Sequence, residues 1–321
     1  VPDPRINKLE ELVKPERVVM ATVDIVDIAG LVKGASKGEG LGNQFLGNIR
    51  ECNAIIHVLR CFDNDNIVHV DGNVNPIRDK ETIDIELQLK DLETVEKRLE
   101  KVKRAAKTGN KEAQVEEALL NRIRETLLQG KSARTVSANN DDEVKLLEDF
   151  QLITTKPVLY VCNVDEGSAV SGNKYVEQVR ELVKEESAEV IVLAVATEAD
   201  ITELETYEER QMFLEDLGLS EPGSSVLIRA AYKLLKQQTY FTAGVKEVRA
   251  WTINIGATAP QAAGVIHSDF EKGFIRAEVI AFDDYVTYGS EAKVKEAGKL
   301  RVEGKEYIVK DGDVMHFRFN V

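Results

Sequence analysis

Four short runs of apolar, mostly β-branched residues set the strongest constraint on the fold of this chain. They span residues 23–28, 54–58, 157–162 and 190–196. Near-continuous apolarity over such a length is typical of strands that are buried on both faces. Helical patterns at residues 42–50 and 173–186 lie between them. Strands that alternate with helices predict an α/β fold with a parallel, doubly wound sheet.

The strand pattern stops between residues 79 and 149, where apolar residues recur at steps of three and four. This spacing predicts two helices, each with one apolar stripe, joined by a turn at Thr108-Gly109-Asn110. Because the turn is short, the two helices should run antiparallel. The sequence therefore predicts a protruding, coiled-coil arm inserted into the α/β domain.

A third region begins at about residue 237. Residues 245–255 and 273–281 have the pattern of strands, and residues 307–321 predict two more strands split by Asp311-Gly312-Asp313. This region is predicted to be a small α+β module. The expected domains are thus the α/β domain in two parts, residues 1–78 and 151–236, the arm between them, residues 79–150, and this module, residues 237–321.

Charge is distributed unevenly along the chain. The formal net charge is −14, which argues against bulk attraction to nucleic acid or to an anionic membrane, so we expect no DNA partner. Residues 97–134 nevertheless contain eleven Lys or Arg and five Glu, a local excess of +6. Such an excess fits either a solvated coiled-coil flank or an RNA-facing patch. The RNA-facing candidates are Lys101, Lys103, Arg104 and Lys107.

The sequence has no predicted membrane-spanning segment. Its longest apolar stretch, residues 190–196, is far shorter than the roughly 20 residues that span a bilayer. No signal peptide is recognisable.

The three cysteines, Cys52, Cys61 and Cys162, have neither the number nor the spacing of a disulfide framework or a zinc site. We therefore expect a cytoplasmic protein with reduced thiols and no membrane partner.

The first predicted strand leads into a segment suited to bind phosphate. Asp27 can hold a magnesium-bound water, and the backbone N–H of Gly30 can approach a γ-phosphate because glycine has no side chain. The loop beyond it can reorder when that phosphate leaves. Taken alone, D-x-x-G also fits a strand that ends in an acidic turn. The glycines that follow make the segment more specific: Gly34, Gly38, Gly40 and Gly42.

This glycine-rich run, residues 27–48, resembles the third nucleotide motif of the Obg superfamily, and in particular of its Obg-like ATPase (YchF) subfamily. The resemblance continues through the arm to a C-terminal region that looks like a TGS domain. It implies a P-loop NTPase sheet with an inserted arm and a β-grasp module. It also implies Mg²⁺-dependent hydrolysis of ATP, used as a conformational switch. The implied partner is the ribosome, through its large subunit or RNA.

The family pattern begins with a G-x-x-x-x-G-K-[ST] loop and a first switch segment, and neither is present in the 321 residues. The residues Val1-Pro2-Asp3-Pro4-Arg5 resemble the segment just after that switch. The loop would supply most of the phosphate contacts and the direct magnesium ligand. We expect the native protein to carry it, because without it nucleotide affinity should be badly impaired and the chain inactive.

The motif Asn163-Val164-Asp165-Glu166 closes a predicted strand where this architecture usually places a base pocket. A related GTPase would show N-K-x-D, whose aspartate accepts the two donors of guanine. Glu166 is one methylene longer, and Val164 replaces the lysine that packs over the base. Adenine should therefore be preferred, read by the Asn163 amide and a backbone group near Val164. Without the family resemblance, N-x-x-E would be read as a plain helix cap.

Leu31 stands where Ras-like switches place the glutamine that orients the attacking water. A leucine cannot do so, and the resemblance therefore implies a hydrolase whose water is positioned by other groups, by a monovalent cation such as K⁺, or by a partner. Two alternatives remain open. The protein could be a GTPase of the same fold, or a non-enzymatic RNA or ribosome adaptor.

Overall fold

The computed structural model describes residues 1–28, 41–69, 72–186 and 188–320. The chain forms two compact units, which are described separately. The three-stranded unit comprises Val26–Gly223, and the six-stranded unit combines Val1–Ile25 with Ser224–Val321.

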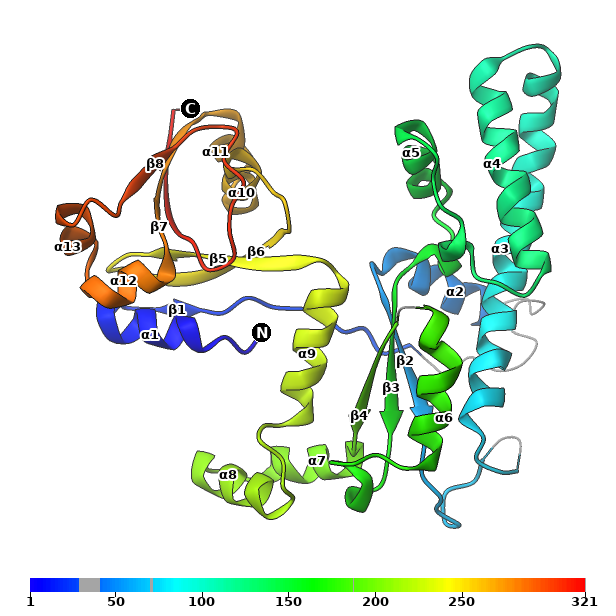
Figure 1. The fold of residues 1–321 in the computed structure, drawn as a ribbon, viewed down its shortest axis with the longest axis horizontal. Helices are drawn as coiled ribbons and strands as arrows, with labels where there is room; N and C mark the ends of the chain where they lie inside the picture. Colours follow the sequence, from blue (N-terminus) through cyan, green and yellow to red (C-terminus); the bar gives the residue numbers. More distant parts are fainter. Residues whose placement is uncertain (29–40, 70–71, 187, 321) are drawn as a thin grey trace. The chain divides into compact units, whose positions relative to one another are not determined.

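A parallel sheet organises the three-stranded unit, with the order β2(Ile55–Arg60), β3(Val158–Asn163) and β4(Glu189–Leu193) (Figure 1). Helix α6(Lys174–Val183) packs its buried valines against β2 and β3. The unit also contains α2(Leu41–Glu51), α7(Val195–Glu203), α8(Tyr207–Asp216) and the short 3₁₀ turns η4(Glu166–Ser168) and η5(Lys184–Glu186). The predicted α/β fold with parallel strands is confirmed.

The strand predicted at residues 23–28 is absent from the described structure. Residues 20–28 have no regular secondary structure, and the nearest strand, β1, covers only Val18–Val19. Asp24, Ile25, Val26 and Asp27 are exposed. A strand is stable only when another strand offers hydrogen bonds to its backbone, and no described strand pairs with these residues. The prediction was wrong because it rested on composition alone.

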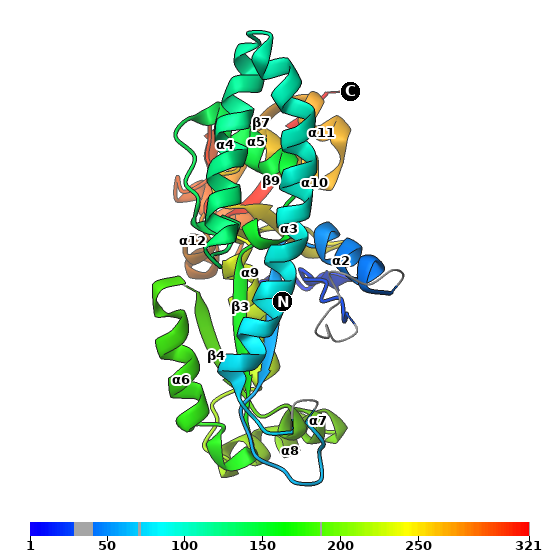
Figure 2. The ribbon, with the colours of Figure 1, turned by 90° about the vertical axis from the view of Figure 1, so that its right-hand side faces the viewer.

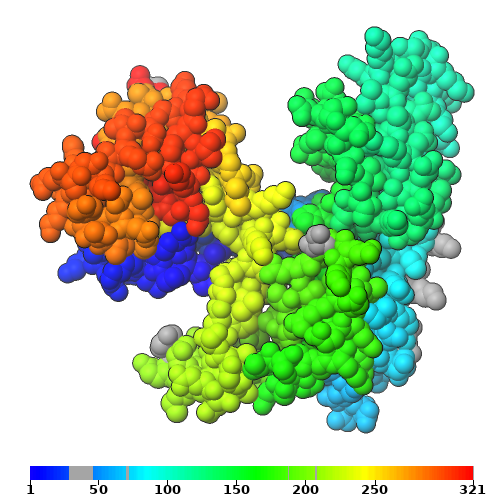
Figure 3. All heavy atoms as spheres, in the orientation of Figure 1, coloured from blue at the N-terminus to red at the C-terminus, as the bar shows by residue number. Residues whose placement is uncertain are grey.

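The arm has the predicted form. Helices α3(Pro76–Lys107) and α4(Lys111–Leu128) lie side by side, as both ribbon views show (Figure 2). Asn110 caps α4, and Gly109, with φ of +87°, supplies the left-handed residue of the turn. The apolar stripes bury Leu99, Leu119 and Ile123 between the helices. In the space-filling view the arm stands out beyond the rest of its own unit (Figure 3).

Helix α5(Asp141–Phe150) and the turns η2(Ala133–Thr135) and η3(Ile153–Thr155) lead the chain from the arm back to β3. Asp91 of α3 is fully buried here, and its carboxylate accepts hydrogen bonds from the backbone N–H groups of Ile153 (2.9 Å) and Thr154 (2.7 Å). Lys80, also on α3, donates to Asp84 (2.6 Å) and to Glu186 (2.7 Å). Polar contacts therefore join the foot of the arm to the sheet region.

The six-stranded unit is built on one sheet with the order β1-β6-β5-β9-β7-β8. Its remaining strands are β5(Gln237–Ala243), β6(Val248–Asn254), β7(Phe274–Ile280), β8(Arg301–Glu303) and β9(Val314–Phe319). Its helices are α1(Pro4–Val13), α9(Gly223–Leu234), α10(Ala259–Ile266), α11(Ser268–Lys272), α12(Phe282–Tyr288) and α13(Glu291–Glu296). The predicted α+β character is confirmed, whereas the TGS assignment stays a prediction.

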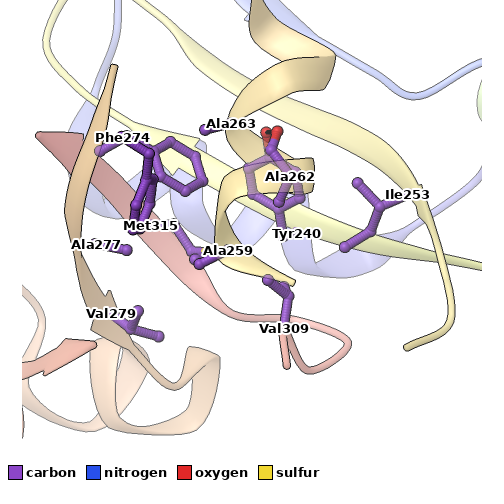
Figure 4. Packing of buried hydrophobic residues seen from close by; sticks show 11 residues of the cluster. Tyr240, Ile253, Ala259, Ala262, Ala263, Phe274, Ala277, Val279, Val309 and Met315 are labelled. Atoms are coloured by element: carbon purple, nitrogen blue, oxygen red, sulfur yellow. Dashed lines mark hydrogen bonds between the residues drawn. The ribbon is translucent and has the colours of Figure 1, made fainter. Parts of the chain in front are cut away.

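Two cores cover the two faces of this sheet. On one face, α10 packs its alanines against Tyr240, Phe274 and Met315 (Figure 4). On the other, Ile6 and Leu9 of α1 are fully buried beside Phe241 and Val248. Only one of the two strands predicted at residues 307–321 forms. The residues before the Asp311-Gly312-Asp313 turn make a single bridge between Ile308 and Thr258.

The domain boundaries differ from those expected. Residues 1–25 were predicted to begin the nucleotide-binding domain, but they pack with residues 224–321, and α9 likewise falls outside the three-stranded unit. The cause is visible in the contacts: β1 pairs in parallel with β6, and Arg5 forms an ion pair with Asp311 at 2.7 Å. Among the described residues, no helix combines the length and apolarity needed to cross a membrane.

Candidate nucleotide-binding site

Asn163 ends β3 at the carboxyl edge of the three-stranded sheet, as predicted. Its backbone carbonyl accepts a hydrogen bond from Cys61 N–H at 2.7 Å, and its Oδ1 accepts one from Val195 N–H, the first residue of α7, at 3.2 Å. The side chain is half-buried. Within the described residues, the Nδ2 group has no protein acceptor, so it is free to donate to a bound base.

Val164 contributes to the core rather than to an open pocket. Its side chain is 3% exposed and packs in the same cluster as Val176 and Val179 of α6. Its N–H donates to Leu193 O at 2.9 Å. A lysine at this position could extend its stem to the surface, but a valine remains buried. The backbone group that reads adenine therefore cannot be the Val164 N–H.

Asp165 and Glu166 have different roles although both are exposed. Asp165 caps η4: its Oδ1 accepts hydrogen bonds from Ser168 N (3.1 Å) and Ser168 Oγ (3.0 Å). Glu166 is the first residue of η4, and among the described residues its carboxylate has no partner. The helix-cap interpretation of N-x-x-E thus holds for Asp165 but does not involve Glu166.

Asn173 belongs to the site, although it was not among the residues predicted from the sequence. Its Nδ2 donates to Cys61 O at 2.7 Å, while its Oδ1 caps α6. An asparagine directly before an amphipathic helix predicts the cap. The bond to Cys61 could not be foreseen, because it depends on how two distant segments meet.

The thiols of Cys61 and Cys162 lie together just beneath this edge, and both are fully buried. The hydrogen bond with the Cys162 sulfur, together with burial, raises the pKa of Cys61. Cys61 therefore stays protonated at neutral pH, whereas the same hydrogen bond lowers the pKa of Cys162. Both side chains pack in the core cluster of this sheet, as the sequence suggested.

The phosphate-binding candidates are only partly described. Asp27 is exposed and, among the described residues, forms no ion pair. The next residue, Ile28, packs against Leu46 and Ile49 of α2. The predicted switch residues Gly30, Leu31, Gly34, Gly38 and Gly40 lie outside the described residues. Gly42, which was also assigned to the switch loop, is instead the second residue of α2, which begins at Leu41, one residue before the predicted start.

Helix α2 is fixed at its carboxyl end. Lys156, just before β3, donates to Arg50 O at 2.9 Å and also to Cys52 O. Burial lowers the pKa of Lys156. Arg50 in turn donates to Thr94 Oγ1 of the arm at 2.8 Å. The helix that follows the predicted switch loop therefore contacts both the sheet and the arm.

The cations of the arm fall into two groups. Those nearer its foot are paired with acids: Lys97, Arg98, Arg122, Arg124 and Arg134. Those toward the tip, together with Lys131, are exposed and form no ion pair with any described residue: Lys101, Lys103, Arg104, Lys107 and Lys111. The four predicted RNA-facing residues are thus all in the unpaired group.

The three-stranded unit combines a parallel sheet with an inserted helical arm, and the carboxyl edge of the sheet presents Asn163 beside the start of α7. This arrangement is that of the α/β nucleotide-binding proteins. Two family profiles match the chain. One, described as a 50S ribosome-binding GTPase, covers residues 11–93, and the other, YchF-GTPase_C, described as a protein of unknown function (DUF933), covers residues 237–320.

The particular family follows from full-length relatives. Proteins named ribosome-binding ATPase YchF from Escherichia coli O157:H7 and Bacillus subtilis are 55% and 54% identical, and each alignment covers 100% of this chain and 88% of the relative. The solved structure of the Schizosaccharomyces pombe YchF GTPase matches with a TM-score of 0.88 and 38% identity, over 99% of this chain and 86% of that one. The chain belongs to the YchF family.

Proposed function

We propose that the protein is a ribosome-associated nucleotide switch that binds ATP in preference to GTP and hydrolyses it to ADP and phosphate. The observation that carries this proposal is the arrangement of Asn163, Asp165 and Glu166 at the carboxyl edge of the sheet. The names of the relatives, which describe them as ribosome-binding ATPases, support it.

The preference for adenine follows from hydrogen-bond chemistry. Guanine offers two adjacent donors that need a correctly placed carboxylate, whereas adenine offers an amino donor beside a ring acceptor. Asp165 is engaged by Ser168, and Glu166 is one methylene too long. The free Nδ2 of Asn163 can donate to the ring nitrogen of adenine. Because the Val164 N–H is already bonded, a backbone carbonyl near it is left to accept from the amino group.

Asp27 fits the role of a carboxylate that holds magnesium through a water. Mg²⁺ usually keeps several waters and takes only one or two protein carboxylates, and Asp27 is exposed and unpaired among the described residues. When bound, Mg²⁺ neutralises charge on the phosphates. Asp27 would orient a metal-bound water, and the Gly30 N–H would donate to the γ-phosphate. We expect direct metal ligands in the phosphate-binding segment of the family pattern, and K⁺ remains the monovalent cation that the resemblance implies.

The ribosome or its RNA is the partner that the arm suits best. The unpaired cations of α3 can contact phosphates without first breaking ion pairs within the protein. This observation also supports the second candidate function, a non-enzymatic RNA adaptor. We infer that the large subunit is the part contacted.

Two measurements on the full-length protein test these functions. Calorimetry with Mg²⁺ should give a dissociation constant for ATP about ten- to a hundredfold below that for GTP, the effect of about 1.5–3 kcal/mol for one charge-assisted contact. Equal or tighter binding of GTP would reject the preference.

In ribosome co-sedimentation, a switch should bind differently with ATP and with ADP. An adaptor should bind equally under both conditions.

A further inference from the structure

The side chain of Asn173 joins three parts of the site. Its Oδ1 accepts hydrogen bonds from Tyr175 N (3.0 Å) and Val176 N (3.2 Å) and so caps α6. Its Nδ2 donates to Cys61 O (2.7 Å), one residue beyond the end of β2, and lies 3.5 Å from Ser168 Oγ. The cap needs only the oxygen. The contacts of Nδ2 with Cys61 O and Ser168 Oγ are not part of the cap of α6, so they need a separate explanation.

The nitrogen completes a chain of hydrogen bonds that ends in the base-binding motif. The Cys61 peptide is held on both sides, because its N–H donates to Asn163 O (2.7 Å) and the Cys61 carbonyl accepts from Asn173. From Asn173 the chain passes to Ser168 Oγ, which donates to Asp165 Oδ1 at 3.0 Å. The segment from Asn163 to Glu166 is therefore tied to β2 at its first residue and, through Ser168 and Asn173, at its third.

We propose that Asn173 is a positioning residue for base selection. It contacts no nucleotide atom itself but fixes the loop that carries the base-reading groups. This inference rests on the proposed function of that loop. Asparagine suits the position because its amide both accepts and donates, whereas Asp and Ser cap helices equally well but provide no equivalent donor at that reach.

The substitution Asn173→Asp separates the two roles. Aspartate keeps the capping oxygen for α6 but removes the donor and sets a carboxylate oxygen against Cys61 O. In the full-length protein, the ratio of GTP to ATP dissociation constants, measured by calorimetry with Mg²⁺, should fall roughly two- to tenfold, the effect of losing one neutral hydrogen bond. The control Asn110→Asp changes the cap of α4, whose Oδ1 accepts from Ala113 N at 3.1 Å, and should leave the ratio unchanged.

The outcomes distinguish this inference from the proposed function. A ratio in Asn173→Asp within twofold of the parent, or an equal loss of affinity for both nucleotides, would overturn the positioning role. If Asn173→Asp fails to fold, Asn173→Ser keeps a capping oxygen, lacks the reach to Cys61, and should give the same fall in the ratio. A parent protein that prefers GTP would contradict the adenine assignment. Even with such a parent, a ratio of dissociation constants that changes in Asn173→Asp but not in Asn110→Asp would support the role of Asn173.

Discussion

Glu166 is the residue at which a single methylene should alter specificity. It is exposed, and its carboxylate has no partner among the described residues, so shortening it should not disturb the fold. We expect Glu166→Asp to shift the ATP-to-GTP affinity ratio toward GTP, incompletely because Val164 remains buried. Calorimetry of the full-length protein measures this ratio. Glu185→Asp, at another exposed position of a 3₁₀ turn, is the control, and an unchanged ratio in Glu166→Asp would exclude Glu166 from base selection.

Asp27 should matter more for turnover than for binding. Its expected contact is with a water on the metal, so Asp27→Ala should lower Mg²⁺-dependent hydrolysis by roughly ten- to a hundredfold, the usual effect of removing an outer-shell partner. ATP affinity should fall less. Asp24→Ala, at an exposed position three residues earlier, should leave both unchanged. Gly30→Ala should independently slow the switch by crowding the γ-phosphate. Normal turnover in both Asp27→Ala and Gly30→Ala would mean that this segment is not the switch.

Residue types in the site were predictable, but their partners were not. The sequence placed Asn163 and Glu166 at a strand end, and the structure has them there. It could not show that Val164 is buried, because a motif gives spacing and not the direction in which a side chain points. Asn173 was missed for a related reason: its bond to Cys61 joins residues that are far apart in the sequence.

At the scale of elements, the arm tip should supply the electrostatic attraction to RNA. Reversing Lys101, Lys103, Arg104 and Lys107 to Glu breaks no ion pair among the described residues, so the thermal midpoint should change little. Binding to ribosomes or RNA should weaken. The slope of log affinity against log salt should also become shallower, by about 0.7–0.9 for each phosphate that the protein no longer neutralises. A variant that binds like the parent at every salt concentration would leave the tip as a solvated face.

A control for this variant lies on α6 and η5. Reversing Lys174 and Lys184, both exposed and in the same unit, tests whether any surface cation has the same effect. Their contacts to Asp63 (4.0 Å) and Glu181 (3.7 Å) are long and exposed, so their loss should cost little stability. Binding should remain at the level of the parent.

His57, on β2, should make the three-stranded unit sensitive to acid. Burial lowers the pKa of His57 to about 4 from an ordinary value of 6.5. Between these two pH values the unfolded chain binds more protons than the folded one, so stability should fall as the pH drops from about 6.5 to about 4. Thermal midpoints across this range should fall less steeply in His57→Leu than in the parent. His267→Gln, at an exposed histidine, should match the parent.

Helices were easier to predict than strands in this chain. The arm helices carry their own periodic signal over many turns, and their backbone hydrogen bonds are local. A strand depends on a neighbour, so residues 23–28 could be apolar and β-branched without forming one. The same dependence explains β1, where Val18 and Val19 form a strand because Val248 and Arg249 of β6 pair with them.

At the scale of the whole molecule, α1 should behave as part of the six-stranded unit. Ile6 and Leu9 are fully buried against its sheet, and Arg5 bridges Asp3 and Asp311 at 2.7 Å each. Hydrogen exchange followed by mass spectrometry should give residues 4–19 the protection of β5 and β6. Arg5→Ala should lower that protection in both. Exchange of residues 4–19 in step with β2 instead would contradict this assignment.

The pairing of β1 with β6 also affects the order in which the protein can fold during synthesis. Val18 can pair only after Val248 has been synthesised, and β9, which lies between β5 and β7, follows later still. At ordinary translation speeds the wait is on the order of ten seconds or more. The three-stranded unit is synthesised entirely within that interval and can fold first. The apolar face of α1 stays uncovered meanwhile, so the nascent chain should be a substrate for chaperones until β9 emerges.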